Sequence, residues 1–154
     1  MNYDVAVVGA GVFGAWTAYQ LRQEGAAVLL LDAYGPGNSR ASSGGESRVI
    51  RLGYGPDEIY SRSAQKSLQR WQQLFGKRET WVNLFQKTGV LWLAREQDQY
   101  CEATLKTLQQ LGANYERLAR DELFRRFPQL ELGPIVWGIL EPDAGVLKIG
   151  RAHV

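Results

Sequence analysis

Three glycines near the N-terminus have the spacing of a dinucleotide-binding loop: Gly9, Gly11 and Gly14. In such a loop the first glycine permits a tight turn, the second lets a pyrophosphate approach the backbone, and the third lets the next helix pack closely on a strand. The start of that helix offers N–H groups and a positive dipole end to phosphates. Asp32 can accept hydrogen bonds from a ribose hydroxyl, and its charge disfavours a 2′-phosphate. Together these residues predict a dinucleotide site.

Two arginines, Arg48 and Arg51, flank an apolar pair in a segment rich in glycine and serine. Arginines in such a segment can have a functional role. Long charged side chains are also common on solvated surfaces. The residues alone leave both interpretations open.

The elements that the glycine motif requires are present around it. Val5–Val8 and Val28–Leu31 are short apolar runs typical of buried parallel strands, and residues 12–24 between them predict a helix that Gly25 ends. The sequence therefore predicts an α/β fold, with a Rossmann-like βαβ unit followed by the start of an α+β domain.

The segment after the second strand changes character, because glycine, serine, proline and asparagine dominate residues 35–55. A polar segment this long indicates a functional loop. Periodicity and breaker residues predict the elements that follow. These are helices over residues 56–75, 98–111 and 120–127, and strands over residues 85–93, 135–140 and 146–147.

The glycine motif occurs in both FAD and NAD enzymes. FAD is favoured because the motif lies at the extreme N-terminus and because the second strand runs into a long polar loop. An NAD(P)-dependent dehydrogenase would instead continue with a third βα unit soon after Asp32. A non-catalytic dinucleotide-binding module is the other alternative, in which Arg48 and Arg51 would have no role.

The order and spacing of these motifs, with residues 42–55, 87–91 and 141–147, resemble the sarcosine-oxidase-like branch of the D-amino-acid-oxidase superfamily of FAD amine oxidases. The resemblance implies oxidation of the C–N bond of an amino acid or N-methyl amino acid, hydrolysis of the imine product, and oxygen as electron acceptor. It also implies that Arg51 binds the substrate carboxylate, and that Arg48 lies near the flavin ring and stabilises its anionic reduced form. The residues expected to contact the cofactor are Gly9, Gly11, Val12, Phe13, Gly14, Asp32, Ala33, Ser42, Ser43 and Arg48.

Two positions affect how closely the chemistry of this chain is expected to match that of the family. Gly44 stands where sarcosine oxidases of this type carry a histidine near the flavin, so no side chain at this position can tune the flavin. Cys101, the only cysteine, lies on the apolar face of a predicted helix and is expected to be a small core residue. The family's covalent flavin cysteine lies in the C-terminal part of its proteins, so Cys101 does not correspond to it. We expect no metal site.

Composition limits the classes of binding partner that we expect for this chain. A net charge of +2 gives no electrostatic case for nucleic acid, and the apolar runs are too short to span a bilayer. Residues 1–4 lack the basic start of a signal peptide, and one cysteine suits a reducing compartment, so a cytoplasmic location is expected. The expected partners are a small-molecule amine or amino acid and oxygen.

The length of 154 residues is less than half that of the proteins the sequence resembles. We therefore expect an N-terminal part that is inactive alone. Residues 1–80 would belong to the FAD-binding domain, and residues 81–148 would begin the substrate domain and include its return strands. The DNA string ATC GGA AGA GCA CAC GTC, which is part of a common sequencing adapter, encodes residues 149–154. We therefore expect this tail to be non-native.

Overall fold

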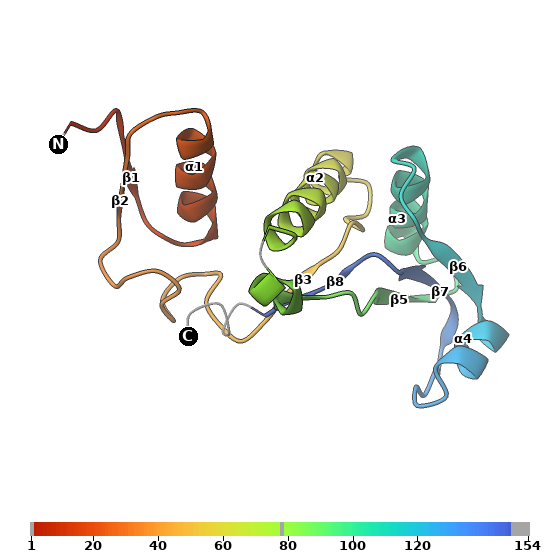
Figure 1. Ribbon diagram of the computed structural model, residues 1–154. Coiled ribbons are helices and arrows are strands. Elements are labelled where there is room, and N and C mark those ends of the chain that lie inside the picture. The colour runs from red at the N-terminus through yellow and green to blue at the C-terminus, as the bar shows by residue number, and fades with distance from the viewer. Residues whose placement is uncertain (1, 78, 149–154) are drawn as a thin grey trace. The chain divides into compact units, whose positions relative to one another are not determined.

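The computed structural model describes residues 2–77 and 79–148 (Figure 1). These residues form two compact units. One runs from Asn2 to Arg48 and includes Lys148, and the other is Val49–Leu147. The suspected tail at residues 149–154 lies outside the described residues, and the expected domain division at residue 80 stays a prediction.

The first unit begins with the expected βαβ arrangement. Strand β1 (Val5–Val8) and strand β2 (Val28–Leu31) are parallel, and helix α1 (Val12–Gln23) connects them. Figure 1 shows α1 alongside the strand pair. Gly25, at φ +94°, lies just after the helix, in a conformation that glycine adopts without strain. The prediction of an α/β fold with a parallel start is confirmed.

The expectation that both strands are buried is wrong for the described residues. Val8 at the end of β1 is 82% exposed and Leu31 at the end of β2 is 46% exposed. Parallel strands become buried when helices or strands cover both of their faces. Here the single helix α1 packs on the pair.

The loop expected over residues 35–55 contains one short strand that the sequence did not reveal, β3 (Arg48–Ile50). It belongs to a three-stranded sheet of order β3–β8–β4, with β4 at Phe85–Gln86 and β8 at Gly145–Leu147. The apolar pair between the two arginines therefore lies in a strand rather than in irregular chain.

A second sheet of the Val49–Leu147 unit has the order β5–β7–β6 and is antiparallel throughout. Its strands are β5 (Val90–Arg95), β6 (Glu116–Ala119) and β7 (Ile135–Glu141). Strand β6 was not predicted, because its sequence is mostly polar and has no clear alternation. The single strand expected over residues 85–93 is wrong, since the chain leaves one sheet after Gln86 and enters the other at Val90. Gly89, at φ +73°, makes that break.

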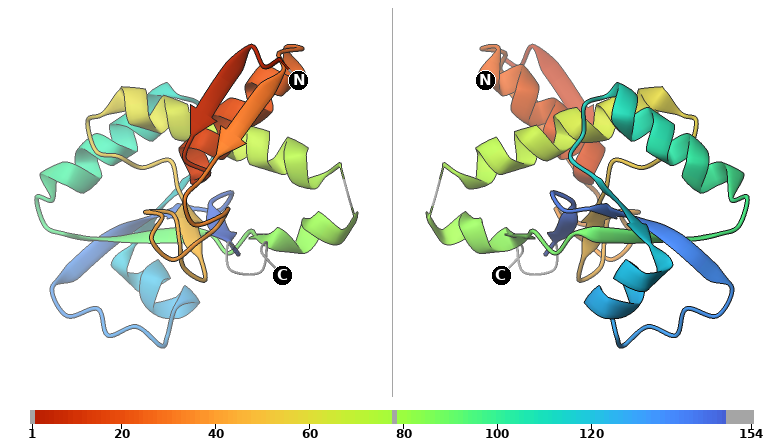
Figure 2. Two further views of the ribbon diagram at one scale, coloured as in Figure 1. Left: turned by 90° about the vertical axis from the view of Figure 1, so that its left-hand side faces the viewer. Right: turned by 90° about the vertical axis from the view of Figure 1, so that its right-hand side faces the viewer.

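The helices of this unit match their predicted positions: α2 (Glu58–Phe75), α3 (Gln99–Gln110) and α4 (Arg120–Arg126). A short 3-10 helix at Glu79–Leu84 was not predicted. Helix α3 covers one face of the β5–β7–β6 sheet and α4 the other (Figure 2). No helix in the described part of the chain has the length and apolar character needed to cross a membrane.

The core of the unit is divided between the two faces of that sheet. On the α3 side, Leu108 and Ile139 are fully buried, and Cys101 is 4% exposed and packs with them. Burial raises the pKa of the Cys101 thiol to about 11, so the thiol stays protonated at neutral pH. The prediction that Cys101 is a core residue is confirmed. On the α4 side, Leu118 and Leu123 form a second cluster.

Candidate functional site

Two of the three motif glycines are required by the fold of the first unit. Gly9 has φ +100°, a conformation that other residues adopt with strain. A Cβ atom at Gly14 would lie 1.7 Å from the carbonyl oxygen of Gly9, so α1 can approach the loop this closely only with glycine there. These are the turn and the close packing that the motif predicts.

Gly11 differs from both. Its φ is −68°, which any residue adopts, and a Cβ atom would meet only Ala41 and Ser43, each at 3.9 Å. Neither the backbone conformation nor the packing of the described residues therefore requires glycine at this position. A ligand that must approach the backbone closely does require it, and this fits the pyrophosphate of a dinucleotide.

The start of α1 is capped from a distant loop. Gly11 is the N-cap residue and has no side chain to offer, and the Val12 N–H instead donates to the Ser43 hydroxyl oxygen at 3.3 Å. The structure thus brings Ser43 to the glycine loop, as expected for a residue of the same site. N–H groups at this end of the helix are the donors that phosphates bind in such loops.

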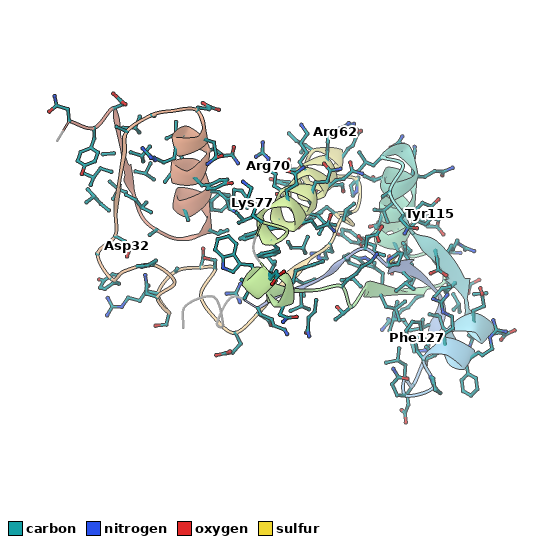
Figure 3. All side chains as sticks on the ribbon, viewed as in Figure 1. Asp32, Arg62, Arg70, Lys77, Tyr115 and Phe127 are labelled. Atoms are coloured by element: carbon teal, nitrogen blue, oxygen red, sulfur yellow. The ribbon has the colours of Figure 1, made fainter. Side chains whose placement is uncertain are left out.

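Asp32 lies directly after β2 (Figure 3) and is tied to the same loop. Its carboxylate accepts hydrogen bonds from the backbone N–H of Ala10 at 2.7 Å and of Tyr34 at 2.8 Å. These bonds, the one from Ala10 above all, lower the pKa of Asp32 below its usual value, so the side chain is ionised at neutral pH. An ionised, partly exposed carboxylate can still accept a hydrogen bond from a ribose hydroxyl.

The other residues expected at the cofactor lie near these groups in sequence and are accessible. Phe13, in the first turn of α1, is 85% exposed, while Val12 is half-buried. Ala33 and Ser42 are exposed. Their contact with a cofactor stays a prediction.

Arg48 is engaged with its own loop. The guanidinium donates to the carbonyl oxygens of Ser47 at 2.8 Å, of Ser42 at 2.9 Å, and of Gly44. A Cβ atom at Gly45 would lie 3.0 Å from the Arg48 Nη1 atom, so the loop wraps closely around the guanidinium. Arg48 therefore holds the loop in shape, and its expected place beside a flavin stays a prediction.

Gly44 is fixed by the same loop. A Cβ atom there would lie 2.8 Å from the carbonyl oxygen of Asn38 and 2.9 Å from that of Ala41. Backbone atoms cannot give way as a flexible side chain can. The histidine that the resemblance implies for this position in sarcosine oxidases therefore does not fit the path that this loop follows.

Arg51 lies in the Val49–Leu147 unit and is held by aromatic rings. The central carbon of its guanidinium is 4.7 Å from the ring centroid of Tyr54 and 4.6 Å from that of Trp92. Its Nη1 atom also donates to the carbonyl oxygen of Gly53. Cation–π contacts of this kind restrict the orientation of an arginine and displace water from its faces. Arg51 is thus half-buried and pre-oriented, unlike a solvated surface arginine.

Glu141 belongs to this site, although the sequence does not reveal it as a candidate. Its side chain is buried, and its carboxylate accepts from three donors: Leu52 N–H at 2.6 Å, Gly53 N–H at 3.1 Å and the Trp92 indole N–H at 2.7 Å. Its place directly before Pro142 gives no sign of this burial. The three donors are the two residues after Arg51 and the indole over which Arg51 lies.

The same segment is held at its other end by α3. The Gly55 N–H donates to the hydroxyl of Thr104 at 3.0 Å, and the hydroxyl of Thr107 donates to the carbonyl oxygen of Gly55 at 2.8 Å. Both threonines are buried. Residues 51–55, the Arg51 segment, are therefore irregular chain, as the sequence predicts, but hydrogen bonds to Glu141, Thr104 and Thr107 hold them in place.

Comparison with known proteins identifies the family of the chain. The family model for FAD dependent oxidoreductases matches residues 4–152. The chain is 34% identical over 150 residues to the peroxisomal sarcosine oxidase of Mus musculus, covering 97% of this chain and 38% of that protein. It is 33% identical over 147 residues to the monomeric sarcosine oxidase of Bacillus sp. (strain B-0618), covering 95% of this chain and 37% of that protein.

The fold has a counterpart among solved structures. NikD, an unusual amino acid oxidase essential for nikkomycin biosynthesis, matches with a TM-score of 0.70 and 29% identity, over 96% of this chain and 38% of that one. The chain thus spans 37–38% of the length of the two sarcosine oxidases. Residues 32–47, where an NAD(P)-dependent dehydrogenase would begin a third βα unit, form turns and loop. Taken with the matched family model, these findings show that the chain belongs to the FAD-dependent oxidoreductases of the D-amino-acid-oxidase type and is sarcosine-oxidase-like.

Proposed function

We propose that this chain is the N-terminal part of an oxidase that acts on the C–N bond of an amino acid or N-methyl amino acid. The sarcosine and amino acid oxidases that it resembles support this proposal. The observation that carries it is Arg51, a half-buried cation held ready by two aromatic rings and a carbonyl oxygen. Such a cation suits a carboxylate ligand, because its own charge has no carboxylate partner among the ion pairs of the described residues.

FAD, when bound, supplies the acceptor for the two electrons that amine oxidation releases. The residues of the first unit fit its ADP half. Gly11 leaves room for the pyrophosphate beside the start of α1, and Asp32 offers a carboxylate oxygen to a ribose hydroxyl. Arg48 holds the neighbouring loop, and its positive charge is proposed to lie near the flavin ring.

Arg51 orients the substrate. Its remaining N–H groups bind the substrate carboxylate, and Tyr54 and Trp92 keep the guanidinium in one orientation. Oxidation removes two electrons and two protons from the H–C–N–H unit of the amine and leaves an imine, which water hydrolyses. Oxygen is the proposed final acceptor, and the proposed location is cytoplasmic.

Arg51→Ala in the complete oxidase tests the carboxylate role. Removing a charge-assisted hydrogen bond should weaken carboxylate binding by about ten- to a hundredfold. Acetate binding can be followed by its effect on the flavin absorption spectrum, while FAD content should stay unchanged. Arg62→Ala is the matched control, because Arg62 is an exposed arginine on α2 that pairs with Glu58 (Figure 3). Equal acetate affinity in Arg51→Ala and the wild type would exclude Arg51 from the substrate site.

A further inference from the structure

Two contacts of the Arg51 guanidinium, with Gly53 and with Trp92, lead to one buried carboxylate. The guanidinium donates to the carbonyl oxygen of Gly53 and lies over the ring of Trp92. The N–H of Gly53 and the indole N–H of Trp92 both donate to Glu141 Oε1, at 3.1 and 2.7 Å. Glu141 comes from the end of β7, far from Arg51 in sequence, and its side chain is 2% exposed.

The fit around this carboxylate is close. A Cβ atom at Gly53 would lie 2.9 Å from Glu141 Oε1, 2.7 Å from Thr104 Cγ2 and 3.0 Å from Trp92 Cζ2. Only glycine lets the backbone after Arg51 reach the carboxylate at this distance. The second oxygen, Oε2, accepts from the N–H of Leu52 at 2.6 Å, so the peptide groups on both sides of Leu52 are fixed.

We infer that Glu141 is a positioning residue for Arg51, which it holds in place through the backbone of residues 52–53 and the indole of Trp92. This inference rests on the proposed carboxylate-binding role of Arg51. A carboxylate accepts all three N–H groups, whereas an amide has one acceptor oxygen and would turn its own N–H groups toward donors. Glu141→Gln keeps the size of the side chain but cannot accept from all three donors, so at least one N–H group loses its acceptor and the network around Arg51 can shift. A small displacement of a positioned binding group is enough to weaken its contact with a ligand.

A general structural role is the competing explanation, because Leu52 also belongs to the hydrophobic core of this unit. The two explanations differ in how Glu141 and Arg51 combine. A residue that acts through Arg51 affects carboxylate binding only while Arg51 is present. A residue that merely stabilises the unit affects binding by the same factor in either background.

The test is a double-mutant cycle in the complete, FAD-loaded oxidase, with acetate as the probe and flavin absorption as the readout. Glu141→Gln should weaken acetate binding by about five- to tenfold. It should have no further effect in the Arg51→Ala background, and FAD content should be unchanged throughout. Glu116→Gln is the matched control, since Glu116 lies in the same unit, on β6, and only pairs with Arg126 at the surface.

The outcomes separate the inference from the function on which it rests. If Arg51→Ala leaves acetate binding unchanged, the proposed function fails. If Arg51→Ala weakens binding but Glu141→Gln does not, or weakens it by the same factor in both backgrounds, the inference alone is overturned.

If Glu141→Gln yields no folded protein, Trp92→Phe is the variant that tests the inference. This substitution keeps an aromatic ring for Arg51 but removes the indole N–H bond to Glu141. It should weaken acetate binding about two- to threefold when Arg51 is present and should have no effect in the Arg51→Ala variant.

Discussion

The glycine loop of the first unit and the Arg51 segment of the second unit are built in different ways. The backbone geometry of the glycine loop is local, because its turn, its close helix contact and its open position at Gly11 all lie within residues 9–14, and bonds to Asp32 and Ser43 add to it. The Arg51 segment depends on residues far along the chain, because Leu52 and Glu141 are 89 positions apart in the sequence. The first region is half-exposed, and the second is largely buried. Backbone geometry therefore prepares one candidate site, and a buried polar network prepares the other.

The largest effect should come from a charge at the open glycine. In the complete protein, Gly11→Asp places a carboxylate where the pyrophosphate is proposed to bind, and FAD affinity should fall by about a hundredfold or more. The fold should survive, because the nearest atoms to a Cβ are 3.9 Å away. The flavin-to-protein absorbance ratio of the purified variant measures this. A variant with normal flavin content would exclude the loop as the pyrophosphate site.

Gly14→Ala should damage the same loop for the opposite reason. Its Cβ atom would lie 1.7 Å from the carbonyl oxygen of Gly9, so α1 must move away from the loop. We expect a loss of about 3 kcal/mol or more in stability, in the upper part of the range for forced overpacking. Chemical denaturation compares this variant with Gly11→Ala, which should be close to wild type. Equal stability of the two variants would contradict the different roles assigned to the two glycines.

These glycines show what can be predicted from the sequence. The βαβ unit, the glycine loop and Asp32 were predicted because their geometry depends on neighbouring residues and on one short crossover. Helix α3 was also predicted, and Asp98 caps it as its residue type suggests, accepting from the N–H of Cys101 at 2.9 Å.

The Arg51 segment shows which contacts could not be predicted from the sequence. Nothing in the residues around Glu141 indicates that its carboxylate is buried, because its three donors come from two distant segments. The break at Gly89 was missed for a related reason. Lys87 and Gly89 interrupt the β-forming residues of 85–93 only briefly, and only the pairing partners β8 and β7 show that the chain changes sheets there. Register and partner choice are long-range properties.

Glu141→Ala tests how much the buried hydrogen bonds of the Arg51 segment contribute to stability. It leaves the N–H groups of Leu52 and Gly53, both buried, without their acceptor. We expect the unfolding free energy of the Val49–Leu147 unit to fall by about 3 kcal/mol, within the cost of unsatisfied buried donors. Denaturant unfolding followed by tryptophan fluorescence measures it. Glu116→Ala, at the surface of the same unit, should change stability little, and a similar loss in both variants would argue against the network.

The smallest effect concerns acid stability of the first unit. The hydrogen bond from the Ala10 N–H lowers the folded-state pKa of Asp32 below its ordinary value of 3.8, so Asp32 contributes stability above pH 3.8. That contribution is lost as the pH falls through the lower folded-state pKa. Asp32→Asn should therefore be less stable than the wild type at neutral pH, and the difference should shrink in acid. Melting curves across this pH range check it, and a constant difference at every pH would contradict the bonding at Asp32.

The most direct test of the account is the absorption spectrum of the complete protein, recorded before and after an N-methyl amino acid is added without oxygen. We predict a flavin spectrum in the purified protein that bleaches on addition of the amine and returns when oxygen is admitted. A protein that binds no flavin, or whose bound flavin does not respond to any amino acid or N-methyl amino acid, would contradict the proposed function.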